Sequence, residues 1–364
     1  MLNWLLVFVP IAVGLHYLRP DSHTWIFVTA ALAIVPLAGW LGKATEQIAE
    51  RTNEGIGGLL NATFGNAAEM IIAIVAMQRG LHDVVKASLT GSIIGNILLV
   101  MGAAAVAGGL KFRTQTFNAS AARIQATMLT LAGIALTVPA AFHYLSGPAG
   151  LVKEFDLSFD ISVVLLVTYA LGLVFTLHTH KKLFEGHCSE AAEVGAAGGP
   201  KTWPIWKSVS ILAGSTALIA WVSEMLVGSV EFAAHELGMS TIFVGVIVVA
   251  IVGNAAEHST AVMVAMKNRM DLSLTIAIGS SIQIALFVAP VLVLSSYFIG
   301  PRPMDLVFTP SEVLAIGLAI AISGQIAGDG ESNWLEGIQL LAVYVILGIV
   351  FFFLPETLPT GGAH

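Results

Sequence analysis

The chain has 364 residues, of which 56% are hydrophobic and 11% are charged, whereas soluble proteins carry about 25% charged residues. This composition excludes an ordinary soluble enzyme and predicts an integral membrane protein. The formal charge of −7 does not indicate a nucleic-acid partner, and a single cysteine, Cys188, excludes an internal disulfide.

Long apolar runs separated by short polar stretches predict membrane helices. None of the runs shows the alternating pattern of a membrane β-barrel, and a helix satisfies its own backbone hydrogen bonds in lipid. The first run has neither the basic start nor the cleavage site of a signal peptide. We therefore expect an all-α protein with eleven transmembrane helices of about 17 to 25 residues, allowing for tilt. Their predicted ranges are 3–18, 23–43, 56–79, 84–109, 120–145, 158–180, 205–229, 239–267, 271–299, 308–328 and 334–354.

The basic residues are distributed unevenly between the two sides of the membrane that these spans define. Of the sixteen Lys and Arg residues, eleven fall on the side that holds the N-terminus and five on the other. Because cytoplasmic loops carry the excess of positive charge, we expect a cytoplasmic N-terminus and an external C-terminus. No organelle-targeting extension precedes the first span, so the expected location is the cytoplasmic (inner) membrane of a prokaryote.

An internal repeat divides the chain into two halves. A shift of 188 residues brings 65–100 onto 253–288, and 12 of the 36 pairs are identical, including the polar ones. Each half would hold five spans, and an odd number places the second half upside down, which is the inverted-repeat arrangement of secondary transporters. The predicted organisation is a first transmembrane helix (1–20), a first five-helix repeat (21–183), a cytoplasmic linker (184–203) and a second, inverted five-helix repeat (204–364).

The predicted linker is the only long loop, and it is rich in Gly and Ala with a few acidic residues. This composition is typical of a flexible connection. Nearby histidines, His178, His180 and His187, match no strong zinc-binding pattern, so we interpret them as solvated loop residues.

The repeated motif places a carboxylate and a carboxamide inside apolar runs. Gly65-Asn66-Ala67-Ala68-Glu69 returns as Gly253-Asn254-Ala255-Ala256-Glu257. A carboxylate at membrane depth costs about 2.5 to 3.5 kcal/mol, and neither motif-bearing run has a Lys or Arg in its interior to compensate it. On a helix, Asn66 and Glu69 share one face, as do Asn254 and Glu257. Their oxygen atoms are ligands for a hard divalent cation such as calcium.

The next span of each half supplies further oxygen ligands, since calcium takes six to eight. Gly91-Ser92-Ile93-Ile94-Gly95-Asn96 aligns with Gly279-Ser280-Ser281-Ile282-Gln283, so each segment offers a hydroxyl and an amide beside glycine. The glycines could break the helix and direct free carbonyl groups toward a cavity. They could equally serve only to let helices pack closely.

The two glutamates suggest how protons would be coupled to the cation. Two adjacent carboxylates repel, so without a metal at least one would take up a proton, and metal binding would expel it. Glu46 and Glu231 follow predicted spans on opposite sides, where they are either entrance acids for cations or ordinary solvated acids at helix ends. His258 is either a proton relay or a packed imidazole.

These motifs resemble those of the calcium/proton exchangers, a branch of the calcium/cation antiporter superfamily. The resemblance rests on residues 61–69, 252–258 and 330–337 and extends from about the second span to the C-terminus. It implies an eleven-helix antiporter in which Glu69 and Glu257 bind calcium and exchange it for protons. The neighbouring ligands that it implies are Asn66, Asn254, Ser92, Asn96, Ser280 and Gln283. Family members often carry a strongly acidic helix between the repeats, whereas the linker here is short and only mildly acidic.

We therefore expect a calcium/proton antiporter that exports calcium by alternating access around a membrane-midplane site. The alternatives are a sodium/calcium or other divalent-cation antiporter and, more distantly, a passive cation channel. The chain contains no H-E-x-x-H pattern, and we expect neither enzymatic activity nor a bound cofactor. The expected partners are calcium ions, protons and membrane lipid.

Overall fold

A computed structural model describes residues 3–52, 54–147, 150, 152–180, 183 and 203–354. The described residues are almost entirely helical, and eight of the helices are long and apolar enough to cross a membrane. Shorter apolar helices cover Asn3–Leu18, Ala67–Gln78 and Pro310–Ile326. Most of the predicted linker, with Cys188 and His187, lies outside the described residues. The prediction of a helical membrane protein is confirmed, and the crossing of the membrane by eleven helices stays a prediction.

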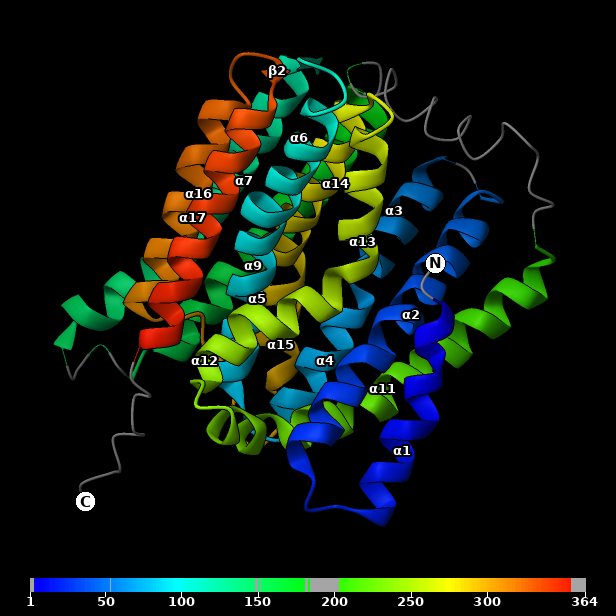
Figure 1. The fold of residues 1–364 in the computed structure, drawn as a ribbon. Coiled ribbons are helices and arrows are strands. Elements are labelled where there is room, and N and C mark those ends of the chain that lie inside the picture. The colour runs from blue at the N-terminus through cyan, green and yellow to red at the C-terminus, as the bar shows by residue number, and fades with distance from the viewer. Residues whose placement is uncertain are drawn as a thin grey trace.

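The helices form one bundle in which α2 packs along α11 on one side and α6 packs along α17 on the other (Figure 1). A short antiparallel pair of strands, β1 (Gln115–Thr116) and β2 (Glu331–Ser332), lies at one end of the bundle. In chain order the helices are η1 (Asn3–Val7), α1 (Phe8–Leu18), α2 (His23–Ala49), α3 (Glu54–Phe64), α4 (Ala67–Gln78), α5 (His82–Ile94), η2 (Gly95–Val100), α6 (Met101–Gly109), α7 (Ala119–Leu145), α9 (Glu154–Val174), η3 (Phe175–Thr179), α11 (Ile205–Glu236), α12 (Thr241–Phe243), η4 (Val244–Val249), α13 (Ala250–Ala265), α14 (Met270–Gln283), η5 (Ile284–Val288), α15 (Ala289–Ser296), α16 (Pro310–Ile326) and α17 (Trp334–Phe353).

Three helical regions differ in extent from the predicted membrane spans, and each difference has a physical reason. Helix α2 continues to Ala49 and α11 to Glu236, because a helix that leaves lipid can continue in water with polar residues on its surface. Glu46 and Glu231 are therefore helical residues and do not follow the helices. The predicted span 56–79 is two helices, α3 and α4, because Gly and Asn are poor helix formers and the chain turns at Gly65-Asn66.

The most buried helices are the two that carry the second set of polar residues. In the continuous helix His82–Gly109, 83% of the most apolar stretch is buried, and in Met270–Ser296 the share is 72%. The corresponding share in Glu154–Thr179 is 17%, because that helix lies at the periphery. The second set of polar residues, Ser92, Asn96, Ser280 and Gln283, therefore lies on the most buried helices of the bundle.

Close helix crossings surround these central helices. A Cβ on Gly91 would lie 1.9 Å from the carbonyl oxygen of Val246, so only glycine allows α5 to cross η4 at this point. Gly102 of α6 and Gly337 of α17 face each other in the same way. For Gly91 the packing interpretation of the sequence is therefore correct, as is common for small residues between membrane helices.

Candidate functional site

The two glutamates of the repeated motif occupy different positions in their helices. Glu69 lies in the first turn of α4, directly after the turn at Gly65-Asn66, and it is only 6% exposed. Glu257 lies in the middle of α13, which runs through its motif without a break. Its side chain is partly buried. The repeat is therefore similar in sequence at these positions but not identical in backbone structure.

The glycine of each motif lies beside the glutamate of the other motif. A Cβ placed on Gly253 would lie 3.2 Å from Oε1 of Glu69, and one placed on Gly65 would lie 3.5 Å from Oε1 of Glu257. Each glutamate therefore reaches across to the chain segment that carries the other. This arrangement brings both carboxylates into the same part of the protein interior.

Four of the predicted polar ligands form one chain of hydrogen bonds. Asn66 donates from Nδ2 to Oε1 of Gln283 over 2.6 Å and accepts at Oδ1 from Oγ of Ser280 over 2.9 Å. Asn96 donates from Nδ2 to Oγ of Ser280 over 3.0 Å. The Oδ1 atom of Asn96 lies 3.1 Å from Nε2 of His258. His258, which the sequence left between two interpretations, is thus bonded to the polar residues around the glutamates.

The other two predicted ligands, Asn254 and Ser92, form a second hydrogen-bonded pair. Asn254 donates from Nδ2 to Oγ of Ser92 over 2.9 Å and to the carbonyl oxygen of Ala250 over 3.0 Å. The 188-residue shift relates Asn254 to Asn66 and Ser92 to Ser280. An Asn–Ser pair that joins the two halves of the chain therefore occurs twice.

The polar cluster around the glutamates contains buried hydrogen-bond acceptors for which it supplies no donor. Among the described residues, Oε2 of Glu69, Oε2 of Glu257 and Oδ1 of Asn254 are buried without a hydrogen-bond partner. No ion pair with a described Lys, Arg or His compensates either glutamate. Because an isolated buried carboxylate is costly, each needs a bound proton or a cation. The buried oxygen atoms are the kind of ligand that a hard divalent cation takes.

The polar segments 91–96 and 279–283 do not break their helices, contrary to one of the two interpretations. Helix α5 continues into the π-helical segment η2, and α14 continues into the π-helical segment η5. The backbone therefore widens directly after Ile94 and Gln283 without leaving the helix. Such π-helical segments are frequent at functional sites. A Cβ on Gly95 or Gly279 would meet nothing within 4 Å, so these two glycines do not serve close packing.

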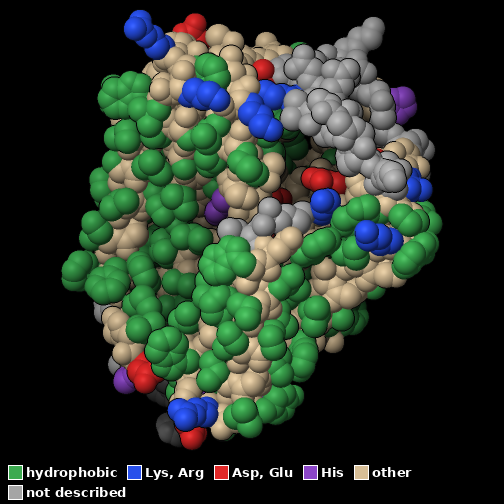
Figure 2. Space-filling view, turned by 45° about the vertical axis from the view of Figure 1, so that its right-hand side comes forward, with side chains coloured by type: hydrophobic (Ala, Val, Ile, Leu, Met, Phe, Trp, Pro, Cys, Tyr) green, Lys and Arg blue, Asp and Glu red, His purple; other side chains and the backbone are tan. Residues whose placement is uncertain are grey.

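One side of the cluster is accessible from the surface. Glu257 and His258 are partly exposed, and Ser259 and Thr260, which follow them on α13, are exposed. Figure 2 shows a hollow in the upper half of the molecule with acidic side chains at its edge and inside it. The part of α4 that follows Glu69 is not accessible in this way, because its apolar side chains, such as Ile72 and Met77, are buried.

The two predicted entrance acids do not belong to the cluster. Glu46, near the end of α2, and Glu231, on α11, are both exposed. Among the described residues, no hydrogen bond or ion pair joins either of them to the residues around Glu69 and Glu257.

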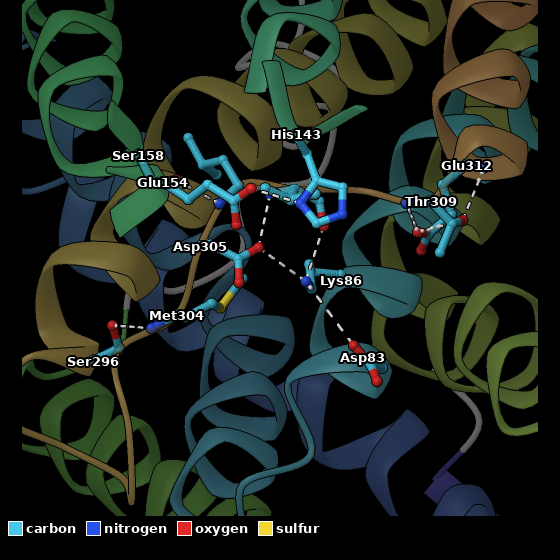
Figure 3. A network of polar contacts seen from close by, with 12 residues as sticks. Asp83, Lys86, His143, Glu154, Ser158, Ser296, Met304, Asp305, Thr309 and Glu312 are labelled. Carbon is cyan, nitrogen blue, oxygen red and sulfur yellow. Dashed lines mark hydrogen bonds and ion pairs between the residues drawn. The ribbon is translucent and has the colours of Figure 1, made fainter. Parts of the chain in front are cut away.

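Sequence reasoning missed a second polar cluster at the start of α5, which we call the Lys86 cluster. It comprises Lys86, Asp83, Asp305, Val307, Thr309 and Glu312. The Nζ atom of Lys86 lies 3.0 Å from Oδ1 of Asp305 and donates to the carbonyl oxygen of Val307 over 2.9 Å. Figure 3 shows Lys86 between Asp305 and Asp83, with the His143–Glu154 pair nearby. Lys86 and Asp305 are 219 residues apart and have no repeated counterpart, so no local pattern announces their contact.

A bundle of apolar helices that encloses uncompensated carboxylates at its centre is the architecture of a membrane ion transporter. The profile described as "Sodium/calcium exchanger protein" matches residues 22–178 and 207–353. The chain belongs to this family and, within it, to the branch of calcium/proton exchangers.

Individual relatives support this assignment over nearly the whole chain. The "Ca(2+)/H(+) antiporter" of Aphanothece halophytica is 46% identical over 359 residues, covering 96% of both chains. The protein of the same name from Synechocystis sp. is 47% identical over 361 residues, again covering 96% of both chains. The solved structure titled "Structure of native YfkE" superimposes with a TM-score of 0.83 at 40% identity, covering 97% of this chain and 100% of the other.

Proposed function

We propose that the protein exports Ca²⁺ in exchange for H⁺ by alternating access around a site that Glu69 and Glu257 form near the middle of the membrane. The name shared by its close relatives supports the pair of transported ions. The observation that carries the proposal is the pair of carboxylates, each with one buried oxygen that has no hydrogen-bond partner, and with no compensating cation among the described residues. Such a pair needs either protons or a divalent cation, and therefore binds them in competition.

Calcium would be held by oxygen atoms from both halves of the chain. Glu69 and Glu257 supply the charge, and six neutral side chains surround them: Asn66, Asn254, Ser92, Asn96, Ser280 and Gln283. The hydrogen bonds among these side chains fix their orientation, which keeps the oxygen-rich surroundings in place while the ion is absent. The unpartnered Oδ1 of Asn254 provides a neutral ligand beside the two carboxylates.

The exchange cycle follows from this competition. When protons occupy the glutamates, the buried charge is neutralised and the cation leaves. When Ca²⁺ enters, its charge replaces the protons and expels them. A rocking motion between the halves would then expose the site to the other side of the membrane. Because both ions use the same carboxylates, the two fluxes run in opposite directions.

The accessible side of the cluster fits a cytoplasm-facing conformation. The partly exposed Glu257 lies on α13, whose C-terminal end leads to Lys267 and Arg269. Lys111 reaches the same end through a hydrogen bond to the carbonyl oxygen of Met266. The charge distribution assigns these basic residues to the cytoplasm. In this proposal eleven helices cross the cytoplasmic membrane as a first helix and two inverted five-helix repeats, with the N-terminus inside and the C-terminus outside.

The decisive experiment measures Ca²⁺ uptake into proteoliposomes with an imposed pH gradient and an internal pH-sensitive dye. We expect the pH gradient to drive Ca²⁺ into the vesicles, and we expect protons to leave the vesicles as Ca²⁺ enters. A channel would let Ca²⁺ flow down its own gradient without moving protons against theirs. Calcium flux without coupled proton flux would therefore overturn the proposal.

The family description makes sodium the second candidate for the counter-ion. Replacing the internal buffer with sodium, in the absence of a pH gradient, tests this directly. Uptake that depends on sodium and ignores the pH gradient would identify a sodium/calcium antiporter. We expect no sodium-driven uptake.

A further inference from the structure

The close approach of Glu69 to Gly253 suggests a further role for this glycine. Gly253 lies on α13 one helical turn before Glu257, and Glu69 reaches it from α4. A Cβ at position 253 would lie 3.1 Å from Cγ, 3.2 Å from Oε1 and 3.4 Å from Cδ of Glu69. The end of the Glu69 side chain thus lies too close to position 253 for a Cβ there to fit without displacing it. The absence of a side chain there sets how far the carboxylate extends toward α13.

The size of the effect can be compared with the difference between cations. Contacts of 3.1 to 3.4 Å are shorter than ordinary van der Waals contacts, so a methyl group at 253 would push the carboxylate back by a few tenths of an ångström. Ca²⁺–oxygen distances are about 2.3 to 2.6 Å, whereas those of the smaller Mg²⁺ are about 2.0 to 2.1 Å. The expected displacement of the carboxylate is therefore about as large as the difference in metal–oxygen distance between a larger and a smaller divalent cation.

We propose that Gly253 determines which divalent cation the exchanger prefers, by letting the Glu69 carboxylate extend to the position that fits Ca²⁺. This inference rests on the proposed function, because it assigns a selectivity role within the same site. Gly253 does not itself bind the ion and acts by positioning Glu69. A purely structural glycine would instead affect all transported cations equally.

The other glycines of the cluster do not offer an equally clean test. A Cβ on Gly65 would lie 2.8 Å from the carbonyl oxygen of Asn61, so a substitution there would displace the backbone before it reached Glu257. A Cβ on Gly91 would strike the backbone of Val246. At Gly253, the three nearest atoms all belong to the Glu69 side chain, which can move.

The test compares wild type with Gly253→Ala for Ca²⁺ and for the larger cation Sr²⁺ in pH-driven proteoliposome uptake. A carboxylate pushed back from α13 leaves a wider site, which suits the larger cation better. We therefore expect the Ca²⁺/Sr²⁺ ratio of kcat/KM to fall in the variant by about tenfold, the lower end of what one methylene group on a substrate changes. Gly317→Ala is the matched control, because it makes the same change in α16 where a Cβ meets nothing within 4 Å. An unchanged or higher ratio, or an equal loss for both cations, would overturn the inference.

A second variant retracts the same carboxylate without touching the glycine. Glu69→Asp shortens the side chain by one methylene group and keeps its charge, so the site again widens and we expect the preference for Ca²⁺ over Sr²⁺ to fall here as well. Calorimetric titration of the purified protein with each cation reads this preference without transport, so it decides the matter even if Gly253→Ala does not fold. If Glu69→Asp keeps the wild-type preference, the reach of Glu69 does not set selectivity. Absence of pH-driven Ca²⁺ uptake in wild type would defeat the proposed function separately.

Discussion

The central cluster and the Lys86 cluster both contain buried acidic groups, but only one of them compensates these groups with the chain's own residues. In the Lys86 cluster, Asp305 is paired with Lys86 over 3.0 Å. Glu312 accepts the backbone N–H of Thr309 and its hydroxyl, each over 2.8 Å, as part of a capping box at the start of α16. Among the described residues, Oε2 of Glu69 and Oε2 of Glu257 are buried without a hydrogen-bond partner, and neither glutamate forms an ion pair with a described Lys or Arg.

This difference separates acids that support the fold from acids that are available for a transported ion. A paired or capping carboxylate has its charge satisfied by the chain itself, so an incoming cation would have to compete with an existing bond. A buried carboxylate with unpartnered oxygens is stable only when something else brings the compensating charge. The comparison therefore predicts opposite consequences when the acids and their partners are replaced.

The largest effect is expected from removing one of the central carboxylates. Glu69→Gln and Glu257→Gln should each reduce Ca²⁺/H⁺ exchange by more than about a hundredfold, which exceeds the cost of losing a residue that merely supports a metal ligand. Each should leave the protein folded, because the amide removes an uncompensated charge. Proteoliposome uptake gives the transport rate, and thermal unfolding in detergent gives the stability. Substantial exchange in either variant would contradict the paired-carboxylate mechanism.

The opposite pattern is expected in the Lys86 cluster. Lys86→Met leaves Asp305 and the carbonyl oxygen of Val307 without their donor, and should destabilise the protein by about 2 kcal/mol, as for other hydrogen bonds to charged groups. Transport per folded molecule should be retained. Thermal unfolding in detergent measures the loss. Adding Asp305→Asn should recover part of it, because the amide oxygen can still accept the backbone N–H of Val307 while the unpaired charge is gone. A folded Lys86→Met protein without transport would place Lys86 in the ion pathway.

The central cluster could be predicted from the sequence because its residues violate local composition. A carboxylate in an apolar run stands out, and its recurrence 188 residues later is enough by itself to pair Glu69 with Glu257. The structure brings these residues together with Asn66, Ser280 and Gln283, all of which the same pattern indicated. Polar residues in lipid are therefore a strong signal, because lipid offers them no other partner.

Two other features of the structure could not be predicted from the sequence, because no unusual residue marks them. The contact of Lys86 with Asp305 joins residues far apart in the chain, near the ends of helices where charged residues are ordinary. The π-helical segments after Ile94 and Gln283 consist of common apolar residues, and no composition distinguishes them from α-helix. The turn at Gly65-Asn66 did have a signal, since Gly and Asn favour turns, but the apolar residues on both sides favoured one continuous span.

The smallest effect is expected at Glu46, which tests where the central cluster ends. This residue is exposed near the end of α2, and no hydrogen bond or ion pair joins it to the described residues of the cluster, so it influences Ca²⁺ only through its charge. Glu46→Gln should raise the apparent KM for Ca²⁺ by about two- to threefold at low salt, as for other exposed charges, and the effect should fade as ionic strength increases. Uptake rates measured over a range of calcium and salt concentrations give this dependence.

The comparison variant is Glu231→Gln, which removes the charge of an exposed acid on α11. Complete loss of exchange in Glu46→Gln would extend the site to the end of α2, since long-range attraction alone cannot account for a loss of that size.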